Sequence, residues 1–234
     1  MNREQIVYNN DNIYPSKVDV LKTMGISKGV EIPEEVEDLY ARSLELYKGL
    51  ISPKGIFSII TKTDFEQIYI GENQNEPLTP LPKIYSKAKL LALYAFTLGK
   101  EISDSINQLM KEKDYPLGFM LDRIASESVD KASAVAEKQF TQNVLIEYQG
   151  SPDQTTLLYS PGYCGWHISA QKKIFEYLKP EKIGVILNES FLMTPIKSVS
   201  GVLVSGERDI HVFKSNFSFC KECTTFTCRE RMQH

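Results

Sequence analysis

Three of the four cysteines lie close together near the end of the chain, at a spacing typical of metal ligands. Cys220 and Cys223 form a CxxC pair, and Cys228 follows five residues later. A tetrahedral zinc site or an iron–sulfur cluster needs four ligands. The fourth would come from elsewhere, with Cys164 as the first candidate and a histidine as the second. Metal or cluster binding is the favoured interpretation, and reduced thiols or a disulfide-exchange role are the alternative.

A second concentration of reactive side chains lies in the segment SPGYCGWHISAQKKIF at 160–175. A strand there is expected to run into a Pro-Gly turn and then into a helix. Free backbone N–H groups point outward at such a junction, and glycines let a ligand approach the main chain closely. The alternative is a tight turn that uses its tryptophan as a packing anchor. The candidate cofactor contacts are Pro161, Gly162, Tyr163, Cys164, Gly165, Trp166 and His167.

Polar side chains are also dense in the Pro-containing stretch NESFLMTPIKSVSG at 188–201. This stretch follows a predicted buried strand, a position that suits the wall of a site. On the residues alone, we favour a solvated loop whose hydroxyls satisfy nearby backbone groups. The candidate contacts, if it is a site wall, are Glu189, Ser190, Ser198 and Ser200. With only three histidines in the chain, a histidine-based triad is not expected.

Apolar spacing predicts the elements of the first half of the chain. A helix is predicted over 34–49, because Pro33 suits an early helical position. Two short apolar runs, 55–60 and 67–70, indicate a hairpin. A Pro-rich linker follows, and then a long amphipathic helix is predicted over 84–109. Gly99 lies inside that helix, where glycine costs about 1 kcal/mol relative to alanine and marks close packing or a kink.

The second half of the chain is predicted to alternate helices with short strands. A helical middle flanked by strands that do not form successive βαβ units favours an α+β fold. Neither a GxxxxGK[ST] loop nor a GxGxxG loop is present, so ATP or dinucleotide binding has no motif behind it. The predicted elements are helices at 117–143 and 169–178, a strand at 155–159, a buried strand at 183–187, and strands at 202–204 and 210–213 joined by a turn at 205–207.

Composition and charge exclude several classes of function. The net charge is -3 and the pI about 5.7, with no basic face for nucleic acid. No segment approaches the roughly 20 apolar residues that span a bilayer, and no apolar leader opens the chain, so a cytoplasmic location is expected. The length suits one body, 1–215, with a cysteine-rich metal or cluster tail at 216–234.

The two loops together resemble the S-adenosylmethionine-binding activation domain of cobalamin-dependent methionine synthase. In that family a Pro-Gly-Tyr turn, a cysteine and a histidine open a helix, as 161–167 do here. A Glu-Ser-Phe segment then leads to Ser-Val-Ser-Gly, as 189–191 and 198–201 do here. The resemblance extends over 35–215. It implies an antiparallel, twisted sheet with long helices packed against it.

The resemblance also implies a function. The chain would be an accessory protein for the reductive reactivation of a corrinoid (cobalamin) protein or corrinoid methyltransferase. The loops at 163–167 and 189–200 would face the corrinoid of that partner, and an iron–sulfur cluster on the cysteines would relay an electron. The family's arginine for the S-adenosylmethionine carboxylate is replaced here by Leu158, which argues against binding of that cofactor.

Two alternatives follow from that replacement and from the cysteines. In the first, the chain is a non-enzymatic docking or chaperone module. It would stabilise the base-off corrinoid or recruit a separate ATP-dependent reductive activase. In the second, the cysteines hold a structural zinc that serves folding only, since zinc can contribute on the order of 10 kcal/mol. Whether the chain is itself an enzyme stays open.

Overall fold

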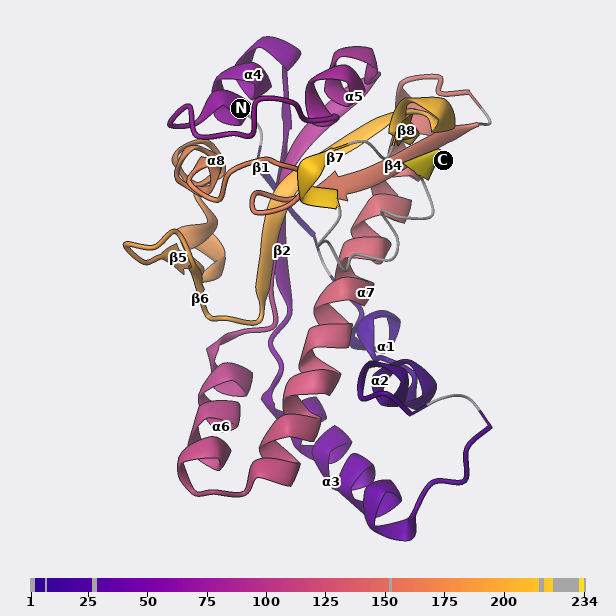
Figure 1. Ribbon diagram of the computed structural model, residues 1–234, viewed down its shortest axis with the longest axis vertical. Helices are drawn as coiled ribbons and strands as arrows, with labels where there is room; N and C mark the ends of the chain where they lie inside the picture. Colours follow the sequence, from indigo (N-terminus) through magenta and orange to yellow (C-terminus); the bar gives the residue numbers. More distant parts are fainter. Residues whose placement is uncertain are drawn as a thin grey trace.

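The computed structural model describes residues 3–6, 8–26, 29–151, 153–214, 217–220 and 232–233. Its centre is a five-stranded sheet in the order β1-β2-β3-β7-β4, in which every neighbouring pair is antiparallel. Figure 1 shows the twist of this sheet, because β4 crosses the direction of β2 at a steep angle. The strands are β1 (Arg3–Ile6), β2 (Lys54–Ile60), β3 (Leu90–Thr97), β7 (Ser198–Glu207) and β4 (Gln154–Tyr159).

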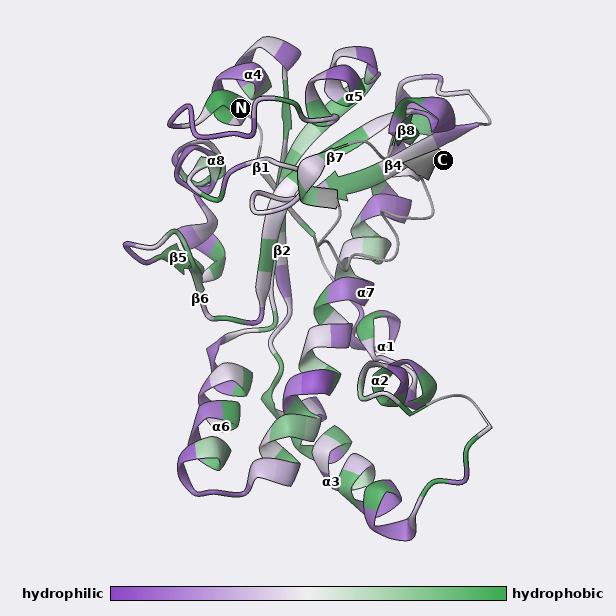
Figure 2. Cartoon of the chain, in the orientation of Figure 1, coloured by the Kyte–Doolittle hydropathy of each residue, from purple (hydrophilic) through white to green (hydrophobic). Residues whose placement is uncertain are grey.

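Helices cover both faces of the sheet. Alternate residues of β3 enter two separate cores, with Leu93 in one and Tyr94 in the other. A strand buried on both faces has few polar positions, and Figure 2 shows more green and white than purple along the sheet. The helices over the Leu93 face are α4 (Lys62–Ile70), α5 (Leu81–Lys87) and α8 (Ala170–Leu178); those over the Tyr94 face are α1 (Asn10–Ile13), α2 (Lys17–Thr23), α3 (Glu34–Leu50), α6 (Lys100–Lys111) and α7 (Tyr115–Glu147).

Short elements complete the described chain. A small hairpin of β5 (Ile186–Leu187) and β6 (Met193–Thr194) follows α8, after the 3-10 helix η1 (Pro180–Ile183). No helix among the described residues is long and apolar enough to span a bilayer. The remaining elements are η2 (Arg208–His211), β8 (Phe213–Lys214), η3 (Ser218–Cys220) and β9 (Met232–Gln233), with β8 and β9 parallel.

The α+β class is confirmed, as is the antiparallel twisted sheet with long helices packed against it. The helices predicted over 34–49, 117–143 and 169–178 are present as α3, α7 and α8. The strands predicted at 55–60 and 155–159 are β2 and β4. Each of these segments has one apolar face or one short apolar run, so its periodicity indicates only one type of secondary structure.

The hairpin and the long helix predicted in the first half are wrong. Residues 67–70 belong to α4, because the hydroxyl of Thr61 caps that helix by accepting from the Asp64 N–H at 3.1 Å. The segment 84–109 divides into α5, β3 and α6. Gly99 has φ +98 and is the N-cap of α6, so it ends the preceding strand segment rather than interrupting a helix.

Two predictions in the second half are also corrected. The strand at 202–204 extends over the whole of β7, so the turn predicted at 205–207 is the end of that strand. Residues 210–213 begin in η2, and 183–187 divide between η1 and the two-residue β5. For β7 a backbone hydrogen bond extends the ladder past residue 204: the Lys89 N–H donates to the Ser205 carbonyl at 2.7 Å.

Candidate functional site

The turn after β4 is a compact loop, fixed by its own backbone. The N–H of Gly162 donates to the Trp166 carbonyl at 2.7 Å, and the N–H of Trp166 donates to the Tyr163 carbonyl at 2.9 Å. Gly162, Cys164 and Gly165 have φ of +93, +54 and +72. A left-handed conformation at three of four successive residues folds the loop back on itself. The predicted junction of strand, Pro-Gly turn and helix is therefore present, and the side chains on it have fixed directions.

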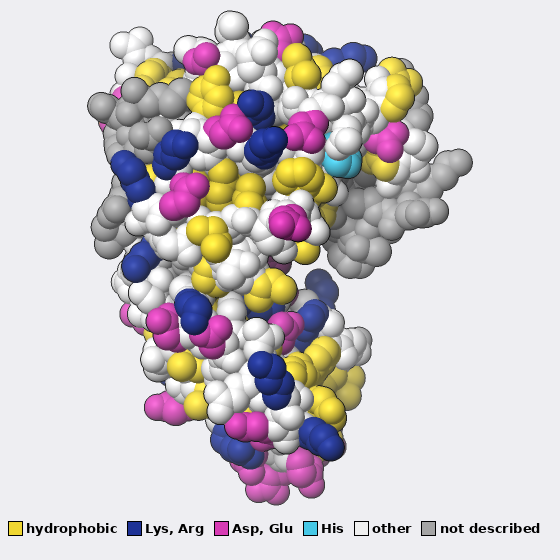
Figure 3. Space-filling view, turned by 90° about the vertical axis from the view of Figure 1, so that its left-hand side faces the viewer, with side chains coloured by type: hydrophobic (Ala, Val, Ile, Leu, Met, Phe, Trp, Pro, Cys, Tyr) yellow, Lys and Arg dark blue, Asp and Glu magenta, His cyan; other side chains and the backbone are white. Residues whose placement is uncertain are grey.

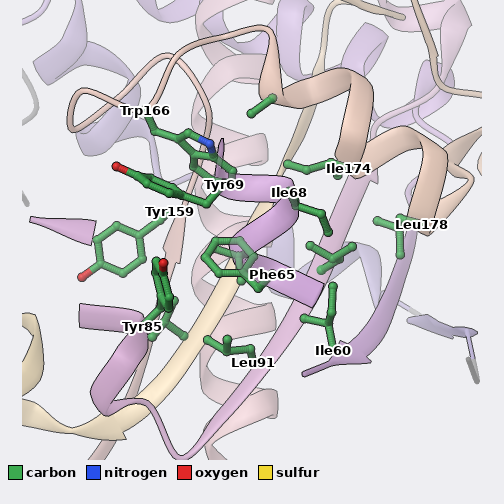
Figure 4. Close-up of a cluster of buried hydrophobic side chains, with 14 of the residues drawn as sticks. Ile60, Phe65, Ile68, Tyr69, Tyr85, Leu91, Tyr159, Trp166, Ile174 and Leu178 are labelled. Carbon is green, nitrogen blue, oxygen red and sulfur yellow. The ribbon is translucent and has the colours of Figure 1, made fainter. Parts of the chain in front are cut away.

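Trp166 points into the core and Tyr163 points out of it. Trp166 is 1% exposed, and its ring packs edge-on against Phe65 at 5.6 Å between centroids, beside Tyr69 at 6.0 Å (Figure 4). Its Nε1 has no hydrogen-bond partner among the described residues. Tyr163 is 58% exposed. Trp166 is thus a packing anchor, and the loop it anchors exposes the large aromatic side chain of Tyr163 at the surface.

The linker before α5 clamps this loop from outside. Asn75 donates through Nδ2 to the Tyr69 carbonyl at 2.7 Å and accepts at Oδ1 from the His167 N–H at 2.8 Å. The Glu76 N–H donates to the Gly165 carbonyl at 3.0 Å. Residues far apart in sequence therefore share one hydrogen-bonded unit. Asn75 was missed by sequence reasoning, because nothing local in a polar linker indicates which loop it will contact.

His167 is held in one orientation by the first turn of α8. Its Nδ1 lies 2.9 Å from the Ser169 hydroxyl and accepts from the Ser169 N–H at 3.2 Å. Since an N–H donates to Nδ1, the proton of the neutral ring lies on Nε2. His167 is half-buried, and with Nδ1 occupied by Ser169 its Nε2–H is the remaining donor of the ring.

Gly165, which follows Cys164 in the chain, lies close to Phe219 at the start of the cysteine tail. Cys164 is half-buried and packs against the core that contains Trp166. The pKa of the nearby Tyr69 hydroxyl is raised, mainly by burial and to a smaller extent by Cys164. An ideal Cβ on Gly165 would lie 2.8 Å from Cε1 of Phe219, the residue before Cys220. Cys223, Cys228 and the side chain of Cys220 lie outside the described part of the chain. Among the described residues, no three His, Cys, Asp or Glu side chains gather as a metal site.

The second predicted stretch divides into two parts. Glu189 and Ser190 are exposed at the tip of the β5–β6 hairpin, whereas Ser198 and Ser200 belong to β7. Ser200 is buried and donates to Gln171 Oε1 on α8 at 2.5 Å, which links β7 to the helix that the 160–167 loop opens. Ser198 donates to the Thr97 hydroxyl at 2.9 Å. Of these four candidate residues, Ser200 is the only one with a hydrogen bond to α8 in the described part of the chain.

Apolar side chains are exposed around the hairpin. Ile186, Leu192 and Ile196 are 55%, 57% and 71% exposed. Figure 3 shows this face, where apolar side chains lie among charged groups of both signs. The hairpin stands out from the molecule below α8 in Figure 1. Its side chains suit contact with another macromolecule better than enclosure of a small ligand.

Polar side chains of α7 reach the ends of β4 and β7. Lys197, just before β7, donates to Asp122 Oδ1 at 2.7 Å and to the Ser126 hydroxyl at 2.8 Å. Further along α7, Glu137 Oε1 accepts from the Leu158 N–H at 2.6 Å. Sequence reasoning did not single out Ser126 or Glu137, because a polar residue on a long helix is normally on its solvated face.

Comparison with known proteins agrees with this architecture. The family model described as "Vitamin B12 dependent methionine synthase, activation domain" matches residues 81–216. Among solved structures, the crystal structure of the MetH reactivation domain bound to AdoHcy superposes with a TM-score of 0.62. That match covers 89% of this chain and 79% of the other at 16% sequence identity, so the likeness is one of fold. No curated protein matches the sequence.

Proposed function

This chain belongs to the family of the vitamin B12-dependent methionine synthase activation domain, and we propose that it is an accessory protein for the reductive reactivation of a corrinoid protein. The partner would be a corrinoid protein or corrinoid methyltransferase in the cytoplasm. The observation that carries the proposal is the fixed loop after β4, which presents Tyr163 outward from a buried Trp166 anchor.

The chemistry of the partner's cofactor defines what such a protein must do. A corrinoid that has been oxidised to cob(II) regains its nucleophilic cob(I) form by gaining one electron from an external reductant. A methyl group transferred from a donor then traps the cob(I) form as methylcorrinoid. This chain would bind over the corrinoid with Tyr163 in contact and the Nε2–H of His167 as a donor to its polar side groups, and would exclude water from that face.

The cysteines are proposed as the ligands of one metal centre: Cys164, Cys220, Cys223 and Cys228. The support is the contact between Phe219 and Gly165, which brings the residue before Cys220 against the residue after Cys164. An iron–sulfur cluster bound there would supply one-electron transfer, whereas zinc would only cross-link the tail to the loop. The cysteine spacing alone does not choose between them.

A second candidate function is a docking or chaperone module that has lost S-adenosylmethionine binding. Two observations favour it over a complete enzyme. Leu158 packs against the core on the α7 side, where the family resemblance calls for an arginine. Glu137 brings a negative charge to the same residue. Such a module would hold the corrinoid base-off, or would recruit a separate reductive activase, without binding the nucleotide.

Docking can be tested with a purified corrinoid protein loaded with cob(II)alamin. Titration of the chain should change the visible spectrum of the corrinoid toward the base-off form. Tyr163→Ala should weaken this binding, since about 1–3 kcal/mol is typical when a large interface aromatic is removed. The matched control is Tyr115→Ala, because Tyr115 is 57% exposed and lies at the far end of α7. Equal effects of both substitutions would contradict the proposed docking loop.

The metal centre has its own test. The chain is purified anaerobically and analysed for iron, sulfide and zinc, together with Cys164→Ser and Cys223→Ser. Iron and sulfide with a visible charge-transfer band, lost in both variants, would support the electron relay with Cys164 as a ligand. Zinc alone would leave the docking module, and a metal-free protein would contradict the centre altogether.

A further inference from the structure

β4 is the edge strand of the sheet, and one of its outward N–H groups is already bonded. In an antiparallel ladder, alternate residues point their N–H and C=O groups away from the partner strand. Leu158 pairs with Leu203 of β7, and its N–H points to the free edge, where Glu137 Oε1 accepts it at 2.6 Å. A carboxylate that accepts from a backbone N–H makes one of the stronger hydrogen bonds found in proteins.

The position of Glu137 is fixed by α7. This helix passes beside β4 in Figure 1 and contacts it. Ala136 and Phe140, its neighbours along the helix, are buried in the core on that side of the sheet. The carboxylate also lies near the fully buried Tyr94 hydroxyl, whose pKa is well above its usual value because of burial first, then Tyr8, then Glu137. Glu137 is therefore part of the packed side of the sheet rather than a freely moving surface acid.

We propose that Glu137 is a specificity-determining residue that occupies the outward N–H of Leu158, at the edge of β4, from within the chain. The ligand class it excludes is an amino-acid carboxylate, such as that of AdoHcy or S-adenosylmethionine. A ligand carboxylate directed to residue 158 would meet a negative charge, with the N–H already donated. The inference rests on the proposed function only for the ligand class, because the geometry at Glu137 does not depend on corrinoid docking.

The proposal makes a non-additive prediction. An arginine introduced by Leu158→Arg would lie beside Glu137 and would pair with it instead of binding a ligand. Leu158→Arg alone should therefore leave AdoHcy binding weak. Leu158→Arg combined with Glu137→Gln should bind AdoHcy at least about tenfold more tightly than Leu158→Arg alone, which corresponds to about 1.4 kcal/mol. The glutamine oxygen can still accept from the Leu158 N–H, so the strand edge keeps its hydrogen bond.

The test is calorimetric titration of the full chain with AdoHcy. The matched control is Leu158→Arg with Lys138→Gln, which changes the exposed neighbour of Glu137 on α7. Tighter binding only in the Glu137→Gln double variant supports the proposal. Equal binding by Leu158→Arg with and without Glu137→Gln overturns it. The proposal is also overturned if the unaltered chain binds AdoHcy tightly and Glu137→Gln weakens that binding, because Glu137 would then be a ligand contact.

A second variant covers the case in which arginine at 158 prevents folding, as judged by circular dichroism. Glu137→Ala in the otherwise unaltered chain leaves the Leu158 N–H open and removes the charge. It should bind AdoHcy about tenfold more tightly than Lys138→Ala does, and equal binding would overturn the proposal. Spectral titration of the cob(II) partner with the same variants tests corrinoid docking separately from AdoHcy binding. Docking should be unchanged in variants whose affinity for AdoHcy changes.

Discussion

Replacing Gly165 by alanine should destabilise the chain, because Gly165 lies where the loop at 160–167 packs against Phe219, Thr79 and Glu76. Gly165 has φ +72, a conformation that costs a residue with a Cβ about 1–2 kcal/mol. The new Cβ would also lie 2.8 Å from Phe219 Cε1, 2.8 Å from Thr79 Cγ2 and 3.0 Å from Glu76 Cβ. Overpacking of this kind adds about 1–3 kcal/mol. We expect Gly165→Ala to lower the free energy of unfolding by about 2–5 kcal/mol, the sum of these two ranges.

Gly184→Ala is the matched control. Gly184 has φ +83, but an added Cβ there would meet nothing within 4 Å, so only the conformational cost remains. Urea unfolding of both variants isolates the packing part as their difference. Phe219→Ala should reduce that difference, because it removes one of the three close atoms. A Gly165→Ala variant that costs no more than Gly184→Ala would refute the contact between tail and loop.

Two further predictions concern stability. Gly201→Ala should abolish or severely reduce folding, because its Cβ would lie 2.2 Å from the Tyr159 carbonyl oxygen, whereas Gly49→Ala in α3 should stabilise the chain by about 0.4–1 kcal/mol. Thermal unfolding of both variants measures the difference, and similar melting temperatures would contradict the contact between Gly201 and Tyr159. The pKa of Glu127 is raised from 4.5 by burial and then by Asp130 and Asp19, so the folded state binds this proton more tightly than the unfolded state and stability falls as the pH rises above 4.5. Glu127→Gln should therefore be more stable than the unaltered chain at pH 7, with the gain disappearing below pH 4.5; urea unfolding across this range measures it, and a gain independent of pH would argue against the assigned cause.

Sequence periodicity predicts an element correctly where one face is buried and the other is exposed. The prediction fails where both faces are buried. α7 has a continuous buried stripe over its length, and its periodicity is unambiguous. β3 is apolar on both faces up to its last residue, Thr97, and a run with so few polar positions matches a helical spacing as well as a strand. α4 could have been predicted from its cap, because Thr61 and Asp64 have the spacing of an N-terminal capping pair.

The candidate site was only partly accessible from sequence. The loop at 160–167 was located because glycine, proline and a lone tryptophan concentrate in one short stretch. The clamp by Asn75 joins residues 92 positions apart, and nothing in the local sequence indicates that pairing. The same holds for Glu137 and Leu158, which meet only because α7 lies along the sheet edge. Glu189 and Ser190 were paired with this loop through the family resemblance, and the fold places them on the exposed β5–β6 hairpin.

The most direct test of the central claim follows the oxidation state of the corrinoid itself. A purified corrinoid methyltransferase is oxidised to cob(II) and mixed anaerobically with titanium(III) citrate and a methyl donor. Its visible spectrum and its methyltransferase turnover are monitored with and without this chain. We predict that the chain accelerates both the loss of the cob(II) spectrum and the return of turnover, and that Tyr163→Ala removes the acceleration while Tyr115→Ala retains it. Recovery at the same rate without the chain would contradict a role in corrinoid reactivation.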